Sequence, residues 1–174
     1  MFKTKALITL CLLALILLQN ASTSKAQRAP ITGDWRIEFN RKNPEVVQLT
    51  MNLGAAPNRQ NWGNSIAISE LQGLSRELAM NSAVDVSLRL VREAGTFELT
   101  GAFRDGKGSG RFALTPDQGF LAALAARGYS NLTDKDVFSA AMSGLRIATV
   151  DELKSSGYDQ LTLNNLIEGA LFKI

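Results

Sequence analysis

The fold of the last third of this chain is decided by a stretch that reads Leu121-Ala-Ala-Leu-Ala-Ala-Arg-Gly-Tyr-Ser-Asn-Leu132 and returns as Val150-Asp-Glu-Leu-Lys-Ser-Ser-Gly-Tyr-Asp-Gln-Leu161. The Gly-Tyr pair and the leucine after it recur at a spacing of 29 residues. A match this dense is typical of a repeated supersecondary unit. We therefore predict two helix–turn–helix units, with about four short helices, in residues 115–174.

Each Gly-Tyr pair is expected to end a helix. Gly128 and Gly157 follow short segments with the apolar spacing of a helix, and glycine adopts the left-handed conformation that closes a helix at the least steric cost. The residue after such a glycine commonly packs back on the last helical turn. This places Tyr129 and Tyr158 at the corners of the two units, and both are candidate contact residues for a ligand or partner.

The beginnings of the helices carry capping signals. Thr133 and Thr162 are expected to be N-caps, and Thr133 with Asp136 resembles a capping box. For the first helix we expect Thr115 as the cap and Pro116 at the first helical position. Local hydrogen bonds should therefore fix where these helices start.

The start of the third helix has two interpretations. Thr149 with Glu152 resembles a capping box, which would begin the helix there. The 29-residue register instead aligns Thr149 with Phe120, inside a helix. Both interpretations stay open from the sequence. Because two units are few for a free solenoid, the first helix is expected to pack on the preceding domain.

Residues 30–114 have an apolar period of two, which is typical of half-buried antiparallel strands. Turn signals at residues 92–95 and 105–108 separate neighbouring runs. We predict about six strands in a meander that forms a small barrel or sandwich, so that the whole chain is α+β. Residues 55–63 are expected to be a polar loop, in which Trp62 is either a lid over the sheet or a contact residue.

The first 26 residues are interpreted as a signal peptide. Lys3 and Lys5 precede an apolar core at residues 6–18, which is short for a membrane span. Ser24-Lys25-Ala26 has the small residues of a cleavage site, so we expect cleavage near Ala26 and a periplasmic or secreted protein; the alternative is a retained anchor. Cleavage would leave 16 basic and 16 acidic residues and no cysteine. No nucleic-acid partner, disulfide or stable membrane span is then expected.

A longer segment resembles a known group of proteins. Residues 95–116 read GTFELTGAFRDGKGSGRFALTP and lead into the Gly-Tyr units. Together these resemble exported bacterial proteins of unknown role, and related segments accompany membrane metallopeptidases of the antirepressor, β-lactam-sensor type. The resemblance covers residues 30–174 and implies an extracytoplasmic accessory or sensing module. It implies no catalytic residues, because the zinc-binding helix of those peptidases has no counterpart in this sequence.

A shorter pattern offers an alternative. Gly33-Asp-Trp35 is similar to the first strand of avidin- and lipocalin-like barrels, in which Gly-x-Trp closes the barrel base. This similarity implies a calycin-like β cup for a small molecule or lipid, with Trp35 and Trp62 as contact residues.

The chain contains no histidine, which excludes Ser-His-Asp and Cys-His catalysis and the usual zinc sites. Asp134 and Asp136 suit a helix start better than a metal pair, so we expect no metal and no cofactor. Our leading hypothesis is an exported non-enzymatic interaction or sensing module that binds a protein or an envelope component such as peptidoglycan. The β cup is the alternative, and an enzyme would depend on carboxylates alone.

Charged residues on the predicted strands leave one further question open. They form either a shared basic face or a mixed-charge face that water solvates. The basic members are Arg36, Arg89, Arg92, Arg104 and Arg111, and the acidic members are Glu38, Asp85, Glu93 and Glu98.

Overall fold

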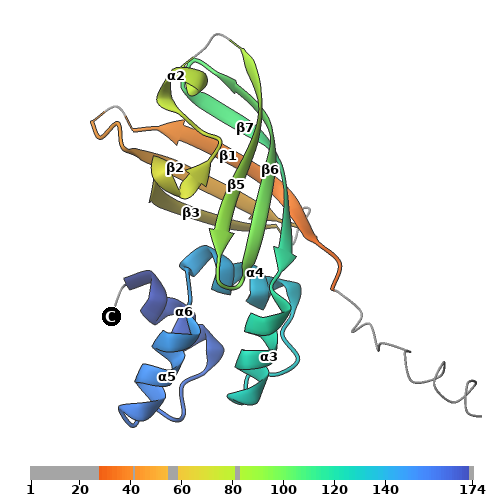
Figure 1. Cartoon of the computed structure of the whole chain (residues 1–174), viewed down its shortest axis with the longest axis vertical. Helices are drawn as coiled ribbons and strands as arrows, with labels where there is room; N and C mark the ends of the chain where they lie inside the picture. Colours follow the sequence, from red (N-terminus) through yellow and green to blue (C-terminus); the bar gives the residue numbers. More distant parts are fainter. Residues whose placement is uncertain (1–27, 41, 55–58, 81–82, 173–174) are drawn as a thin grey trace, which may run out of the picture.

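The computed structural model describes residues 28–40, 42–54, 59–80 and 83–172, which form an α+β fold (Figure 1). A curled sheet of seven antiparallel strands comes first, and the four helices that follow it in the chain gather at one end of it. The strands are β1 (Ile31–Phe39), β2 (Val46–Leu53), β3 (Gln60–Ala67), β4 (Leu71–Gln72), β5 (Val84–Arg92), β6 (Gly95–Arg104) and β7 (Lys107–Pro116). The helices are η1 (Ile68–Glu70), α2 (Arg76–Ala79), α3 (Gln118–Ala126), α4 (Asp134–Ser143), α5 (Ile147–Ser155) and α6 (Leu163–Phe172).

The sheet has the order β3-β2-β1-β7-β6-β5-β4 and curls into a half-barrel. Its two edge strands, β3 and β4, are joined by the three residues of η1, so the chain itself draws the edges together. The predicted hairpin turns lie between β5 and β6 and between β6 and β7. In the second of these turns Asp105 and Gly106 have φ of 51° and 79°, the left-handed pair that a tight hairpin needs.

The structure has one strand more than the six or so that we expected, because β4 has only two residues. The expected polar loop at residues 55–63 is wrong at its end, where β3 begins at Gln60 and Trp62 lies opposite Met51 of β2. β3 is an edge strand, and polar or charged side chains are common on such strands. Its polar sequence therefore resembled that of a loop. Residues 55–58 lie outside the described part of the chain.

The interior of the half-barrel is filled by the protein's own side chains. Trp35 is only 2% exposed and lies in a cross-strand row with Gly110 of β7 and Gly101 of β6. A Cβ atom at Gly101 would come within 2.8 Å of the Trp35 ring, so glycine makes the space that the indole occupies. The indole N–H donates to the Thr100 carbonyl at 3.1 Å, which satisfies its buried polar group.

The helices repeat with the 29-residue spacing of the sequence. The bounds of α5 and α6 lie 29 residues after those of α3 and α4. We call residues 117–145 the first unit and residues 146–172 the second unit. None of the described helices is long and apolar enough to cross a membrane.

The structure corrects the predicted start of α3 and decides between the two interpretations of the start of α5. Thr115 and Pro116 belong to β7, where Pro116 pairs with Gly95, and the N-cap of α3 is Asp117, whose carboxylate accepts from the Phe120 N–H at 2.7 Å. Proline suits the end of a strand as well as the start of a helix, so the pattern was ambiguous. Thr149 lies inside α5, as the repeat register indicated.

A distant residue supplies the missing cap of α5. Its N-cap residue, Arg146, makes no side-chain cap bond. The Ile147 N–H instead donates to the Glu93 carboxylate in the β5–β6 turn at 3.1 Å. This bond ties the start of the second unit to the half-barrel.

The first unit is joined to the half-barrel by aromatic packing. We expected α3 to pack on the β domain, and the aromatic contact that the structure shows comes from α4. Phe138 of α4 stacks on Phe112, with ring centroids 5.6 Å apart, and meets Phe97 edge-on at 6.1 Å. Phe138 and Phe97 are fully buried, so sheet and helices share one hydrophobic core.

Candidate functional site

The two Gly-Tyr corners have the same backbone structure. Gly128 and Gly157 have φ of 97° and 89°. The Tyr129 N–H donates to the Leu124 carbonyl at 3.0 Å, and the Tyr158 N–H donates to the Leu153 carbonyl at 3.1 Å. With the bonds from the two glycine N–H groups, this is the Schellman pattern in both units. The sequence prediction of paired corners is confirmed.

The second helix of each unit begins with the same box of hydrogen bonds. The Thr133 hydroxyl accepts from the Asp136 N–H, and the Asp136 carboxylate accepts from the Thr133 N–H at 2.8 Å. In the second unit Thr162 and Asn165 repeat both bonds, with an amide oxygen in place of the carboxylate. Both predicted N-caps are confirmed, so the second unit reproduces the local structure of the first.

Three contacts hold the second unit against the first. The Arg127 guanidinium donates to both carboxylate oxygens of Asp151. The Tyr129 hydroxyl donates to the Leu161 carbonyl at 2.9 Å. The Lys154 ammonium lies 5.3 Å from the centre of the Tyr129 ring, within range of a cation–π interaction.

These contacts change the ionisation of two groups. The hydrogen bonds from Arg127 lower the pKa of Asp151 below its ordinary value, because they stabilise the carboxylate. Burial raises the pKa of the Tyr129 phenol, since its anion would lose hydration. Tyr129 therefore keeps its proton at neutral pH and remains the donor to Leu161.

Two positions that are covered in the first unit are exposed in the second unit. Tyr158, the counterpart of half-buried Tyr129, is 57% exposed. Leu171, the counterpart of Met142, is 37% exposed, whereas Met142 is 5% exposed. We call Tyr158 and Leu171 the open face. Its surroundings are acidic, because the described residues of the second unit include two basic and four acidic side chains.

The structure does not bring the four candidate contact residues together. Trp35 lies in the filled interior, which removes it as a surface contact residue. Trp62 is half-buried on β3, in the same cross-strand row as Met51 and Trp35. Tyr129 already serves the contact between units, and only Tyr158 is exposed. Leu171 was missed, although its 29-residue match to Met142 was visible in the sequence.

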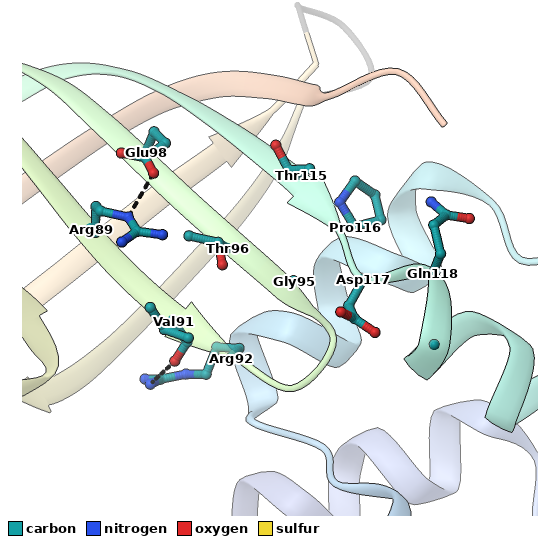
Figure 2. A pocket seen from close by; sticks show the side chains of 11 residues that line it. Arg89, Val91, Arg92, Gly95, Thr96, Glu98, Thr115, Pro116, Asp117 and Gln118 are labelled. Atoms are coloured by element: carbon teal, nitrogen blue, oxygen red, sulfur yellow. Dashed lines mark hydrogen bonds and ion pairs between the residues drawn. The ribbon is translucent and has the colours of Figure 1, made fainter. Parts of the chain in front are cut away.

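The cavities of the described residues lie on the surface. Figure 2 shows one between β5, β6 and the start of α3, where Arg89 pairs with Glu98 at 2.7 Å. Arg92, also in its lining, pairs with Glu70 at 2.7 Å. The described residues contain no group of three or more acidic, cysteine or histidine side chains that could hold a metal ion.

Comparison with known proteins gives no match to this chain, whether with protein-family models, curated proteins or solved structures.

Proposed function

We propose that the protein is an exported, non-enzymatic interaction module and that a protein partner docks on the open face. The observation that carries this proposal is the difference between Tyr129 and Tyr158. The same side chain at the same helical corner is covered by a neighbouring unit once and is exposed once. Leu171, at the end of α6, repeats the difference, and large exposed apolar side chains are candidates for contact surfaces.

The contact between the two units indicates what kind of partner fits. The side chain of Tyr129 is covered by a helical corner, which offers the Leu161 carbonyl as acceptor and the Lys154 ammonium over the ring. A helical partner segment with a backbone acceptor and a basic side chain would cover Tyr158 in the same way. The acidic second unit favours such a basic segment by charge complementarity.

A second copy of this chain suits the open face less well. To cover the open face, the first unit of that second copy would have to present the surface that corresponds to the one through which the second unit contacts the first. Phe138, at the register position of Ile167, already lies against Phe97 and Phe112 of its own sheet. That surface is therefore occupied within each copy.

Export rests on the sequence, since residues 1–27 lie outside the described part. The resemblance to exported bacterial proteins supports the same proposal, with a sensing role or an envelope component as the broader context. Mass spectrometry of the protein purified from its natural host tests it directly. A mature chain that begins near residue 27 is expected, and a cytoplasmic full-length chain would contradict export.

The β cup receives no support from the interior. Trp35, Ile37, Leu49, Phe97 and Leu99 are each no more than 2% exposed and fill the space that a ligand would need.

The docking proposal is tested by capture with matched variants. The full chain and the variants Tyr158→Asp and Leu171→Asp are used to capture partners from an envelope extract of the natural host. Met80→Asp and Val91→Asp are the controls, because these apolar residues are 52% and 46% exposed on other elements. A partner that is lost with the first pair and kept with the controls is the expected result. Equal capture by all four variants would contradict the proposal.

A further inference from the structure

One surface cavity of the described residues has an excess of positive charge. The cavity of Figure 2 contains two arginines and two acids, and a second, beside the end of α4, has the same balance. A cavity at the corner of the first unit contains one acid and no basic residue. The fourth, of about 730 Å³ on the outer face of the half-barrel, contains three arginines and one acid. We call this fourth cavity the arginine cavity.

The sheet register explains how these charges meet. Asp34 of β1 lies opposite Arg111 of β7, and Arg36 lies two residues along β1 on the same outward face. Arg59, just before β3, reaches the same carboxylate from the other side. Residues that are up to 77 positions apart in the chain therefore form one charged cluster.

A single carboxylate serves two of the three guanidinium groups. Arg59 donates to one oxygen of Asp34 at 2.9 Å, and Arg111 donates to the other at 3.3 Å. Arg36 forms no ion pair with any residue that the structure describes. The cluster has an excess of two positive charges, and such an excess attracts anions.

Neutral hydrogen-bonding groups complete the lining. Asn52 and Asn61 lie in the cross-strand row of Asp34, and Thr50 lies opposite Arg36. Amide and hydroxyl groups both donate and accept hydrogen bonds, so they suit the hydroxyl groups of a small polar ligand. Guanidinium groups match the geometry of phosphate oxygens.

We propose that the arginine cavity binds a phosphate monoester, the dianion of which matches the excess of two positive charges. Arg36 and Arg111 hold the phosphate, and Asp34 keeps Arg111 and Arg59 beside the cavity. Arg111 is 70% exposed and Arg59 is 51% exposed, so salt screens the interaction and the affinity falls as ionic strength rises.

To test this, the full chain is titrated with glycerol phosphate at low salt, and binding is measured by isothermal titration calorimetry. Arg36→Gln and Arg111→Gln should each weaken binding by about tenfold, as expected for one charge-assisted hydrogen bond. Arg104→Gln is the control, because Arg104 is exposed on β6 and is not part of the cavity lining. Glycerol, which has no charge, should not bind.

Arg36→Gln should leave the fold intact, because Arg36 has no ion pair within the described residues. Weaker binding by this variant therefore reports on the cavity and not on folding. Absence of glycerol phosphate binding, or equal weakening by Arg36→Gln and Arg104→Gln, would overturn the proposal. Two sources of the ester are then separated with phosphatidylcholine vesicles that contain or lack phosphatidic acid. Selective binding to the former assigns a lipid headgroup, and binding of glycerol phosphate alone assigns a soluble ester.

Discussion

The first and the second unit have the same local structure and differ in what covers them. Their helices begin and end 29 residues apart, and their corners and caps make corresponding hydrogen bonds. Their exposure differs, because Met142 is 5% exposed whereas Leu171 is 37% exposed. The motif therefore determines the local fold, while the surroundings of each unit determine which of its side chains remain exposed.

The largest predicted effect is a difference between these two apolar positions. Met142→Ala should lower the free energy of unfolding by about 2–5 kcal/mol, because a nearly buried side chain is removed from a packed core. Leu171→Ala should cost less than about 1 kcal/mol, since its side chain already meets water. Urea unfolding of both variants checks the pair. Equal costs would mean that the second unit is as covered as the first.

The two corner glycines should behave alike. Gly128→Ala and Gly157→Ala should each cost about 1–2 kcal/mol, because both positions are left-handed and alanine is strained there. The control is Gly169→Ala within α6, where nothing lies within 4 Å of an added Cβ and φ is not left-handed. We expect that control to be stabilising by about 0.5–1 kcal/mol. Thermal unfolding of the three variants decides whether the corners are equivalent, and a cost at only one of them would break the comparison.

The two tyrosine hydroxyls should differ. Tyr129→Phe removes the donor to the Leu161 carbonyl and should cost about 0.5–1.5 kcal/mol. Tyr158→Phe should change the free energy of unfolding by less than about 0.5 kcal/mol. Tyr158 is exposed, so its hydroxyl can meet water in the folded and in the unfolded chain alike. Chemical denaturation of the two variants under the same conditions measures this difference, and a larger loss in Tyr158→Phe would show that Tyr158 has a contact within the chain.

The smallest effect is the acid dependence of the contact between units. Arg127 lowers the pKa of Asp151 in the folded protein, so the stabilisation is present above the unfolded pKa and is lost as pH falls through the lowered folded value. The stability difference between the natural chain and Asp151→Asn should therefore be complete at neutral pH, begin to fall near the unfolded pKa of about 4, and vanish once the pH is below the lowered folded pKa. Asp159→Asn is the control, since Asp159 is exposed and has no ion pair in the described part. A difference that persists in acid would exclude the carboxylate as its source.

Much of the helical region could be predicted because its signals are local. The glycines at the corners and the Thr133 and Thr162 boxes act within a few residues, so the sequence contains all of their partners. The start of α5 was ambiguous because its cap, Glu93, lies 54 residues away. The α+β class and the curled sheet were predicted correctly, since the period of two reports one buried face.

The candidate site depended on information that the sequence does not contain. Tyr129 and Tyr158 each follow a glycine and precede a leucine by three residues, and the difference in their exposure arises from the stacking of the two units. The cluster around Asp34 likewise requires the register of β1 against β7. Trp62 was assigned to a loop because a polar edge strand resembles one.

Selective nitration of tyrosine compares the exposure of Tyr129 and Tyr158 in the same molecule, because the chain contains only two tyrosines. The free protein is treated with a limiting amount of reagent, and the modified peptides are quantified by mass spectrometry. We predict that Tyr158 reacts faster than Tyr129 and that a captured partner protects Tyr158. Equal reactivity of the two tyrosines, or faster reaction of Tyr129, would contradict the open face of the second unit.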